Sequence, residues 1–452
     1  MPPFARRLLI APLALCAAAA PAAAWTSGQT VSPTDRDGRT PAVAMNASGA
    51  AVLAWVDGPW DARGVVVARR SDRGGWESPV RVSSREGVAI DPAVAIDGTG
   101  GVIVVWRQRI GDQWRTVGGR TVRRPVWVVR ARGTDRDGRW GPVATLSPTR
   151  LKVGAPRVAA DADGNAVAVW HWGTGTQPSS TGFVGQVQAA TLVDGRWSRA
   201  RRLSGTPGCR EERQARVAMS TNGDALVWWV CDRRARAITI TLPGRPADGV
   251  WGERAPSPLR PNGDIALAGD GTVGAVDADR DGTVRWWRAD RPNDRPVAFA
   301  SLPRPGTGER ARGGAGPRIA IADDGDAMSA WVAAGRTGDL RVAPVAAALG
   351  PGSALTLPGM SPAAGVRVLA GAQRQAATIW VAGAGTPQAL VLAAGRGADG
   401  RWSTPVALSP TPGGITARSL GVAGTARTAI AAWERTTSGG RHVIVLSQHT
   451  AP

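Results

Sequence analysis

The sequence predicts an all-β protein folded as a β-propeller of eight four-stranded blades. Two observations carry this prediction: a hairpin-like motif recurs eight times, and a turn followed by Trp comes after most of its copies. A third observation concerns the ends of the chain, because the first segment after a hydrophobic leader completes the last unit. Helical signals are weak throughout, since Gly and Pro recur every few residues and apolar runs are short.

The recurring motif is 15 residues long and first reads PAVAMNASGAAVLAW, from Pro41 to Trp55. Its alternating first half predicts a strand, and the small residues around Gly predict a tight turn. Its apolar second half predicts a strand buried on both faces, with the large Trp ring at the end. The eight copies align without gaps and end at positions 55, 106, 170, 229, 277, 331, 380 and 433, the fifth with Asp277 in place of Trp.

A second element follows most hairpins and consists of a third strand, a turn and a Trp that opens a fourth strand. The turns end at Trp76, Trp140, Trp197, Trp251 and Trp402. A Ser stands seven residues after four of these Trp residues, at Ser83, Ser147, Ser204 and Ser409. Each unit therefore has four antiparallel strands in about 54 residues, which is the content of one propeller blade.

The two ends of the chain complement each other. The eighth unit ends at Pro452 after a third strand, 442–447, and lacks a fourth. The segment WTSGQTVSP (residues 25–33) has the pattern of that missing strand, with Ser32 seven residues after Trp25. We therefore expect residues 25–32 to complete the last blade and close the ring, because an open array would leave unpaired strand edges. Seven blades remain the alternative if the decayed fifth unit forms no blade.

Residues 1–24 have the pattern of a secretory signal peptide, with Arg6 and Arg7, an apolar stretch and a small-residue cleavage site. Residues 25–452 are then a single propeller domain. No later stretch approaches the roughly 18 apolar residues of a membrane-spanning helix, so we expect a secreted, extracellular protein, with association to the cell surface left open. Cys209 and Cys231 form an even pair in an exported chain, which predicts a disulfide.

The chain is strongly basic, with a formal net charge of +20 and 55 Lys and Arg residues. Such a charge attracts anionic polymers. The positive charge is almost all arginine, however, because Lys152 is the single lysine and the sequence has no Tyr. This bias is typical of high-GC coding and explains much of the excess without a nucleic-acid partner. An anionic polysaccharide or cell-surface polymer is the expected partner, with a protein partner as the alternative.

The predicted ligand site lies on loops that share one face of a propeller. Between the second and third strands of the second blade, residues 107–127 form the longest such insertion and contain six arginines. Cations interleaved with aromatic rings suit stacking on sugars while pairing with acidic groups. An extended solvated hairpin without a ligand is the alternative. The predicted ligand-binding residues are Arg107, Arg109, Trp114, Arg115 and Trp127, with Trp172 from the third-blade loop.

A metal site is predicted in the fifth unit, where Asp277, Asp279 and Asp281 precede Gly282 in a DxDxDG pattern. Alternating carboxylates with Gly at the sixth position can wrap Ca²⁺. The bidentate Glu expected at the twelfth position is missing, since Arg288 stands there. The sequence therefore predicts calcium as the one candidate cofactor, with an incomplete ligand set.

The Asp-Gly-x-Trp turns resemble the Asp-box (BNR) repeats of sialidase-like propellers. Those repeats carry Ser-x-Asp-x-Gly-x-Thr-Trp at the same turn, and Gly lies one residue closer to Trp in this sequence. The resemblance covers short turns and implies architecture, because the Asp-box is structural in that family. Catalysis there uses an arginine triad, a Tyr nucleophile and acidic partners. The absence of Tyr here excludes a conventional sialidase reaction, and no arginine triad can be assigned.

These observations favour an exported, non-enzymatic propeller that binds a polymeric or protein ligand, with an anionic glycan or cell-envelope polymer as the expected ligand. No residue is predicted to be catalytic. The alternative from another class is a carbohydrate-active enzyme, either a glycoside hydrolase or a polysaccharide lyase. That alternative requires Asp57, His171 or Glu434 to converge on one pocket. A structural scaffold without a small ligand is the third alternative.

Overall fold

The computed structural model describes residues 24–450 with internal gaps, and nearly all of the predicted signal peptide lies outside the described residues. The gaps fall at residues 73, 136, 149–151, 174–185, 205–211, 232–233, 242–249, 252–254, 257–262, 279–281, 290–299, 302–310, 312–315, 335–338, 346–354, 358–363, 385 and 416–418. In the described part of the chain, no helix is long and apolar enough to span a membrane.

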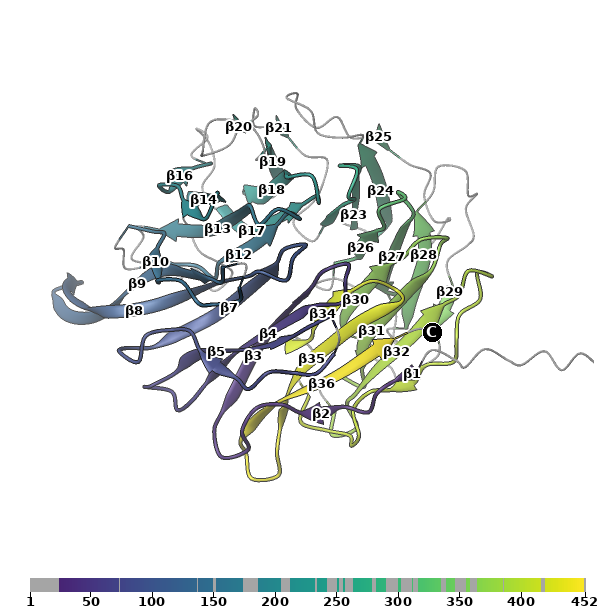
Figure 1. Ribbon diagram of the computed structural model, residues 1–452, viewed down its shortest axis with the longest axis horizontal. Helices are drawn as coiled ribbons and strands as arrows, with labels where there is room; N and C mark the ends of the chain where they lie inside the picture. The colour runs from purple at the N-terminus through teal and green to yellow at the C-terminus, as the bar shows by residue number, and fades with distance from the viewer. Residues whose placement is uncertain are drawn as a thin grey trace, which may run out of the picture.

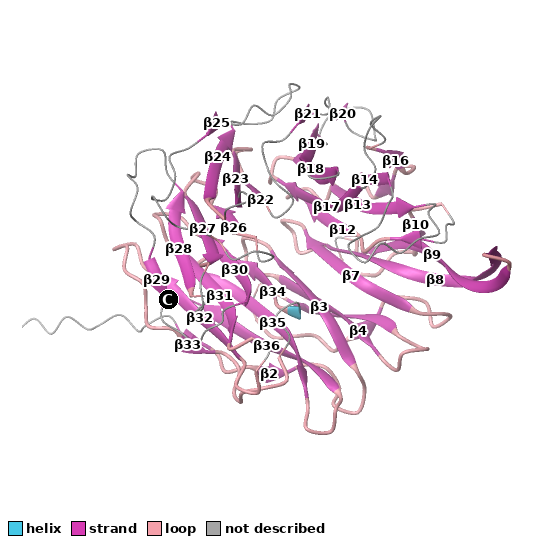
Figure 2. Cartoon of the chain, turned by 180° about the vertical axis from the view of Figure 1, so that it is seen from behind, coloured by secondary structure: helices cyan, strands magenta, loops and turns pink. Residues whose placement is uncertain are grey.

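The described strands form eight antiparallel sheets, one for each copy of the motif, which confirms the all-β prediction. We number the sheets as blades 1 to 8 in chain order. They follow one another around a common centre, as Figures 1 and 2 show from opposite sides. The fifth unit, whose motif ends in Asp277, also forms a four-stranded sheet. Substitution of this Trp has therefore not abolished strand pairing in that unit.

The first four blades contain the following strands, in chain order. Blade 1 has β3 (Gly38–Met45), β4 (Ala51–Asp57), β5 (Gly64–Arg70) and β6 (Val80–Arg81). Blade 2 has β7 (Ala89–Ile96), β8 (Val102–Val117), β9 (Arg120–Gly133) and β10 (Ala144–Thr145). Blade 3 has β11 (Lys152–Val153), β12 (Arg157–Ala160), β13 (Ala166–Gly173), β14 (Gln186–Val193), β15 (Arg196–Trp197) and β16 (Arg201–Arg202). Blade 4 has β17 (Glu212–Met219), β18 (Asp224–Cys231), β19 (Arg234–Thr241), β20 (Val250–Trp251) and β21 (Ala255–Pro256).

The last four blades follow the same plan, and the last one adds two strands from the other end of the chain. Blade 5 has β22 (Asp264–Leu267), β23 (Val273–Ala278), β24 (Val284–Ala289) and β25 (Ala300–Ser301). Blade 6 has β26 (Arg318–Ile321), β27 (Ala327–Val332), β28 (Leu340–Val345) and β29 (Leu355–Leu357). Blade 7 has β30 (Ala364–Ala370), β31 (Ala376–Ala382), β32 (Leu390–Arg396) and β33 (Val406–Ala407). Blade 8 has β34 (Gly421–Gly424), β35 (Thr428–Thr436) and β36 (His442–Thr450), and β1 (Ala24–Trp25) and β2 (Gln29–Thr30) pair with β36.

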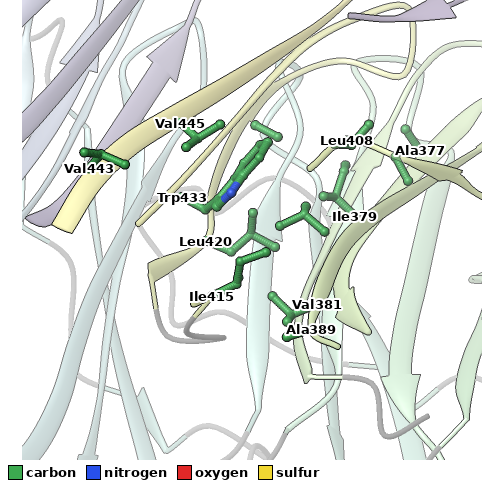
Figure 3. Packing of buried hydrophobic residues seen from close by; sticks show 13 residues of the cluster. Ala377, Ile379, Val381, Ala389, Leu408, Ile415, Leu420, Trp433, Val443 and Val445 are labelled. Atoms are coloured by element: carbon green, nitrogen blue, oxygen red, sulfur yellow. The ribbon is translucent and has the colours of Figure 1, made fainter. Parts of the chain in front are cut away.

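The core consists of hydrophobic clusters between neighbouring blades. The Trp residues that end the motif are at most 1% exposed: Trp55, Trp106, Trp170, Trp229, Trp331, Trp380 and Trp433. Figure 3 shows one cluster, in which Trp433 and Val445 of blade 8 pack toward Ile379 of blade 7. Another cluster joins Leu53 of blade 1 to Ile444 of blade 8. Burial of these rings explains why the motif keeps a Trp at a fixed position. Truncation of a buried aromatic side chain to Ala lowers the free energy of unfolding by about 3–5 kcal/mol.

The serines that follow the turn Trp residues hold the outer edge of each blade. In blade 2 the backbone N–H of Val129 donates to Ser147 Oγ at 2.8 Å, and in blade 3 that of Val187 donates to Ser204 Oγ at 2.7 Å. Ser83 and Ser409 accept the equivalent bond in blades 1 and 7. Each hydroxyl thus satisfies a buried donor of the third strand where the short fourth strand does not reach.

The N-terminal segment makes the same contacts with the last blade. Trp25 is opposite His449 across β1 and β36, and Thr30 is opposite Val445 across β2 and β36. Ser32 Oγ accepts a hydrogen bond of 2.9 Å from the N–H of Ile444. This segment therefore occupies the position of the fourth strand in blade 8, more than 400 residues from its partners.

Candidate functional site

The first strands of consecutive blades contact one another, and β34 of the last blade contacts β3 of the first. The first strands of neighbouring blades therefore lie side by side, as the innermost strands of propellers do, and propellers commonly place their ligand sites near those strands. The second residue of the motif lies within the first strand of the motif in blades 1 to 7 and directly before β34 in blade 8. In blades 1 to 8 this position is occupied by Ala42, Ala93, Arg157, Arg216, Asp264, Arg318, Arg367 and Leu420.

Four arginines and one aspartate at this repeat position form the candidate site. We call Arg157, Arg216, Asp264, Arg318 and Arg367 the arginine cluster. Arg216 Nη1 lies 2.6 Å from Asp264 Oδ1, which is the one ion pair within the cluster. No other described carboxylate forms an ion pair with these arginines. The cluster therefore carries four cations and one anion, a net charge of +3.

The other three arginines turn back toward their own strands. Arg157 donates to the carbonyl of Pro156 at 3.3 Å, and Arg318 donates to that of Pro317 at 3.4 Å. Arg367 donates to the carbonyl of Val366 at 3.0 Å. A guanidinium has five N–H donors, so one or two carbonyl bonds leave most of its hydrogen-bonding capacity unused.

Burial and the charge of neighbouring arginines both disfavour the charged state of Arg157, Arg318 and Arg367. Burial, together with the nearby charge of Arg318, lowers the pKa of Arg367 to about 10. Burial likewise lowers the pKa of Arg318, and Arg216 adds to the effect while Asp264 opposes it. Arginine side chains nevertheless stay charged at neutral pH. A bound anion would relieve the repulsion between them.

Arg157 combines solvent exposure with a perturbed environment. Part of its side chain is exposed, yet surrounding protein lowers its pKa, and the charge of Arg216 acts in the same direction while Asp91 opposes it. A side chain that lines a solvent-filled opening has both properties. Guanidinium groups in such a setting bind carboxylate, sulfate or phosphate through paired hydrogen bonds.

Arg107, one of the predicted ligand residues, links the arginine cluster to the second-blade insertion. It forms an ion pair with Asp91 and donates to the carbonyl of Val153 at 2.9 Å. Its guanidinium also lies 5.3 Å from the ring centre of Trp127. Asp91 in turn acts electrostatically on Arg157. Arg107 and Asp91 therefore connect the insertion electrostatically to Arg157 of the arginine cluster.

The second-blade insertion is an extended ribbon rather than an irregular loop. Strands β8 and β9 stay in register from Ile103 opposite Gly133 to Val117 opposite Arg120, with one irregularity beside Arg109. The ribbon projects from the ring in Figure 1. Arg109 and Trp127 line a cleft of about 450 Å³ at its base. Trp114, farther along the ribbon, is 67% exposed.

The remaining predicted ligand residues have other surroundings. Trp172 is partly buried and packs against the core cluster between blades 2 and 3. The backbone of Arg115 belongs to β8, but its side chain is not among the described ones. Trp172 does not line the cleft at the base of the ribbon.

The three residues that a hydrolase would have to bring together are each engaged elsewhere. His171 Nε2 accepts a hydrogen bond of 3.2 Å from the N–H of Ala215 in the next blade. Asp57 lies 3.4 Å from Arg36. Glu434 accepts a bond from the N–H of Thr40 in blade 1 and lies 2.7 Å from Nδ1 of His442.

The predicted metal and disulfide sites fall mostly outside the described residues. Asp277 is fully buried and lies 3.3 Å from Arg285, while Asp279 and Asp281 are not described. In the described part of the chain, no three His, Cys, Asp or Glu side chains gather as metal ligands. Cys209 is also undescribed, and Cys231 ends β18. The calcium site and the disulfide therefore stay predictions.

A wider cleft, of about 1890 Å³, lies between blades 2 and 3 at their turns. Among its lining residues, Asp97 already accepts hydrogen bonds from the N–H groups of Thr99 and Gly101 in its own turn. Asp163 and Arg199 also contribute to the lining. We assign it no ligand, because its best-placed carboxylate is occupied by local backbone donors.

The comparisons with known proteins do not assign the chain to a family. No family model matches the chain, and no curated protein matches it. Among solved structures, a protein of unknown function from Dyadobacter fermentans is similar over 96% of this chain and all of its own, at 11% identity and a TM-score of 0.47. An α-L-arabinofuranosidase from Fusarium graminearum is similar over 94% of this chain and 97% of its own, at 10% identity and a TM-score of 0.41. A leech intramolecular trans-sialidase covers 66% of this chain and 65% of its own, at 10% identity and a TM-score of 0.37.

Proposed function

We propose that the blades form a closed ring of eight, with residues 25–32 as the outer strand of the last blade. The pairing of β1 and β2 with β36 supports this closure. So do the hydrophobic cluster shared by blades 8 and 1 and the bond from Thr40 N–H to Glu434. The ring places the arginine cluster on inner strands that face one another across its middle.

The function proposed for this ring is binding of an acidic glycan, with a carboxylate or sulfate group of the ligand held by the arginine cluster. One observation carries the proposal: three partly desolvated arginines, Arg157, Arg318 and Arg367, lack a carboxylate partner in the described part of the chain. Buried or half-buried charges are normally paired. An external anion would supply the missing partner.

Hydrolysis of the glycan is the second candidate function. The described carboxylates that act electrostatically on the cluster arginines are Asp264 and Asp91, which are the candidates for a hydrolase at this site. Each is already bound by an arginine, Arg216 and Arg107 respectively. That arrangement suits a positioning role better than the proton-donating acid of a glycoside hydrolase. Binding without turnover is therefore the proposed function.

The test compares the Arg318→Gln and Arg367→Gln variants with the unaltered protein by titration calorimetry against galacturonate and polygalacturonate. A hydrogen bond to a charged group contributes about 1.5–3 kcal/mol, so each variant should bind about 10- to 100-fold more weakly. Arg139→Gln is the matched control, because Arg139 is 80% exposed and pairs only with an exposed Asp137. It should bind like the unaltered protein.

Two outcomes would overturn the proposal. One is equal binding by Arg367→Gln and Arg139→Gln, which would place the anion elsewhere. The other is binding of a neutral glucan such as dextran as tightly as polygalacturonate, which would remove the role of charge. A reducing-end assay on the same samples tests the hydrolase candidate, since new reducing ends should not accumulate.

A further inference from the structure

A second set of aromatic and basic side chains lies at the base of the ribbon. These side chains narrow the class of ligand that the protein can be expected to bind. The cleft at the base of the ribbon, which we call the ribbon cleft, lies between the loop that follows β4 and the ribbon of β8 and β9. Side chains that can contact a ligand there are Trp60, Arg63, Arg109, Asp112, Arg123 and Trp127.

Strand pairing places a row of these side chains on one face of the ribbon. Arg109 is opposite Trp127, and Trp114 is opposite Arg123. Residues directly opposite each other in an antiparallel pair project to the same face. Because Asp112 and Trp114 are two positions apart in one strand, they also share a face. Trp114 therefore extends the lining of the ribbon cleft outward along the ribbon.

Two large aromatic side chains of this region are unusually exposed. Trp60 is 74% exposed and Trp114 is 67% exposed, the highest values among the exposed large hydrophobic residues in the described part of the chain. The motif Trp residues, by contrast, are buried. An exposed tryptophan beside a cleft offers a flat apolar surface, and rings of sugars or bases stack on such surfaces.

The charges of the ribbon cleft are mixed. Arg109 donates to both oxygens of Asp112, at 2.6 and 2.7 Å, and Arg123 lies 2.5 Å from the same carboxylate. The hydrogen bonds from Arg109 lower the pKa of Asp112. Across the cleft, Nε of Arg63 is buried without a hydrogen-bond partner. The cleft thus combines surplus cationic donors with an ionised acceptor.

This combination distinguishes two kinds of anionic polymer. The Asp112 carboxylate can accept hydrogen bonds from sugar hydroxyls, whereas it would repel a phosphodiester backbone. The arginines favour acidic groups on the polymer, and the exposed rings favour stacking. An acidic polysaccharide satisfies all three conditions better than a nucleic acid does.

We propose that the ribbon cleft binds sugar units of an acidic polysaccharide, stacked on Trp60 and Trp114, while an acidic group of the same chain occupies the arginine cluster. This inference rests on the proposed function, because it assumes an anion in the arginine cluster. Arg107 supports the continuity of the two sites, since it stacks on Trp127 and pairs with Asp91 beside Arg157.

The test measures binding of galacturonate monomer and of polygalacturonate chains to Trp60→Ala and Trp114→Ala. Stacking on an aromatic ring contributes about 1–3 kcal/mol, so each variant should weaken binding of the chains about 5- to 100-fold. Binding of the monomer should stay unchanged, because the monomer needs only the arginine cluster. Val406→Ala, at another exposed hydrophobic residue, is the control and should affect neither ligand.

The outcomes separate this inference from the proposed function. The ribbon cleft is not a sugar site if polygalacturonate binds the unaltered protein no more tightly than the monomer does. The same holds if polygalacturonate binds both Trp variants as tightly as it binds Val406→Ala. In either case the arginine cluster can still hold the anion. If the monomer fails to bind and Arg367→Gln leaves chain binding unchanged, the proposed function fails instead. A poly-dT strand should bind more weakly than polygalacturonate at equal salt, and Asp112→Asn should narrow that difference. Equal or tighter binding of poly-dT would overturn the choice of polysaccharide.

Discussion

Replacement of Arg367 by glutamine should stabilise the folded protein when no ligand is present. Most substitutions at partly buried positions lower stability. Arg367 differs because its charge is surrounded by protein and by other cations of the arginine cluster. Glutamine carries no charge and is shorter, so the substitution removes the guanidinium and its hydrogen bond to the carbonyl of Val366.

The magnitude follows from the pKa of Arg367, which burial and the neighbouring arginines lower from the ordinary arginine value to about 10. Each pKa unit corresponds to about 1.4 kcal/mol, so the charged form costs the folded state about 3 kcal/mol. The unfolded chain holds this proton more tightly than the folded chain. The cost is therefore fully present at pH 7 and disappears only as the pH rises above about 10. Loss of one hydrogen bond subtracts about 1 kcal/mol, which leaves a net stabilisation of about 1–2 kcal/mol.

The assay is urea-induced unfolding at pH 7 and low ionic strength, followed by fluorescence of the 20 Trp residues. The midpoint of Arg367→Gln should exceed that of Arg139→Gln. Added sulfate should raise the midpoint of the unaltered protein more than that of Arg367→Gln, because a ligand stabilises only the state that binds it. Destabilisation of Arg367→Gln by 2 kcal/mol or more would refute the reasoning, since it would mean that the guanidinium is already paired.

Three further predictions test the architecture. Ser147→Ala should lower the free energy of unfolding by about 1–3 kcal/mol, because it leaves the buried N–H of Val129 without an acceptor; no change would mean that another group takes over. Deletion of residues 25–33 should lower the melting temperature and promote association through the exposed edge of β36, and an unchanged melting temperature would contradict closure by this segment. Burial lowers the pKa of His449, so the unfolded chain takes up the proton first and stability should fall as the pH drops below about 6.5. His449→Gln should flatten a melting profile measured from pH 8 to 5, and an equally steep profile would assign the loss to other groups.

The architecture could be predicted because a feature that recurs at the same position in the copies of a repeat indicates a shared structural role. A Trp at the end of one apolar run is ambiguous, but Trp106 and Trp170 at the same place in gap-free copies indicate a shared core position. The Ser seven residues after the turn Trp was visible in the sequence for the same reason. Its role, as acceptor for the third strand, required the structure.

The arginine cluster could not be recognised from composition, because 55 basic residues are spread through the whole chain. Its signal lies in the phase of the motif, since Arg157, Arg216, Arg318 and Arg367 all stand at the second position. Polar residues at that position alternate with apolar neighbours, which is the pattern expected of the solvent-facing side of an ordinary amphipathic strand. In the proposed ring this side of the strands faces the middle, where separate units bring their charges together.

The same repeat position shows that the arginines are not needed for the fold. Blades 1 and 2 have Ala42 and Ala93 there, and their first strands pair with the second strands just as those of the arginine-bearing blades do. A small neutral side chain is therefore sufficient for blade formation. Four like charges at the equivalent position lower stability through desolvation and repulsion. Residues that weaken a fold are typical of binding sites, where stability is given up for affinity. This contrast within one chain is the strongest internal argument that the arginine cluster serves a ligand.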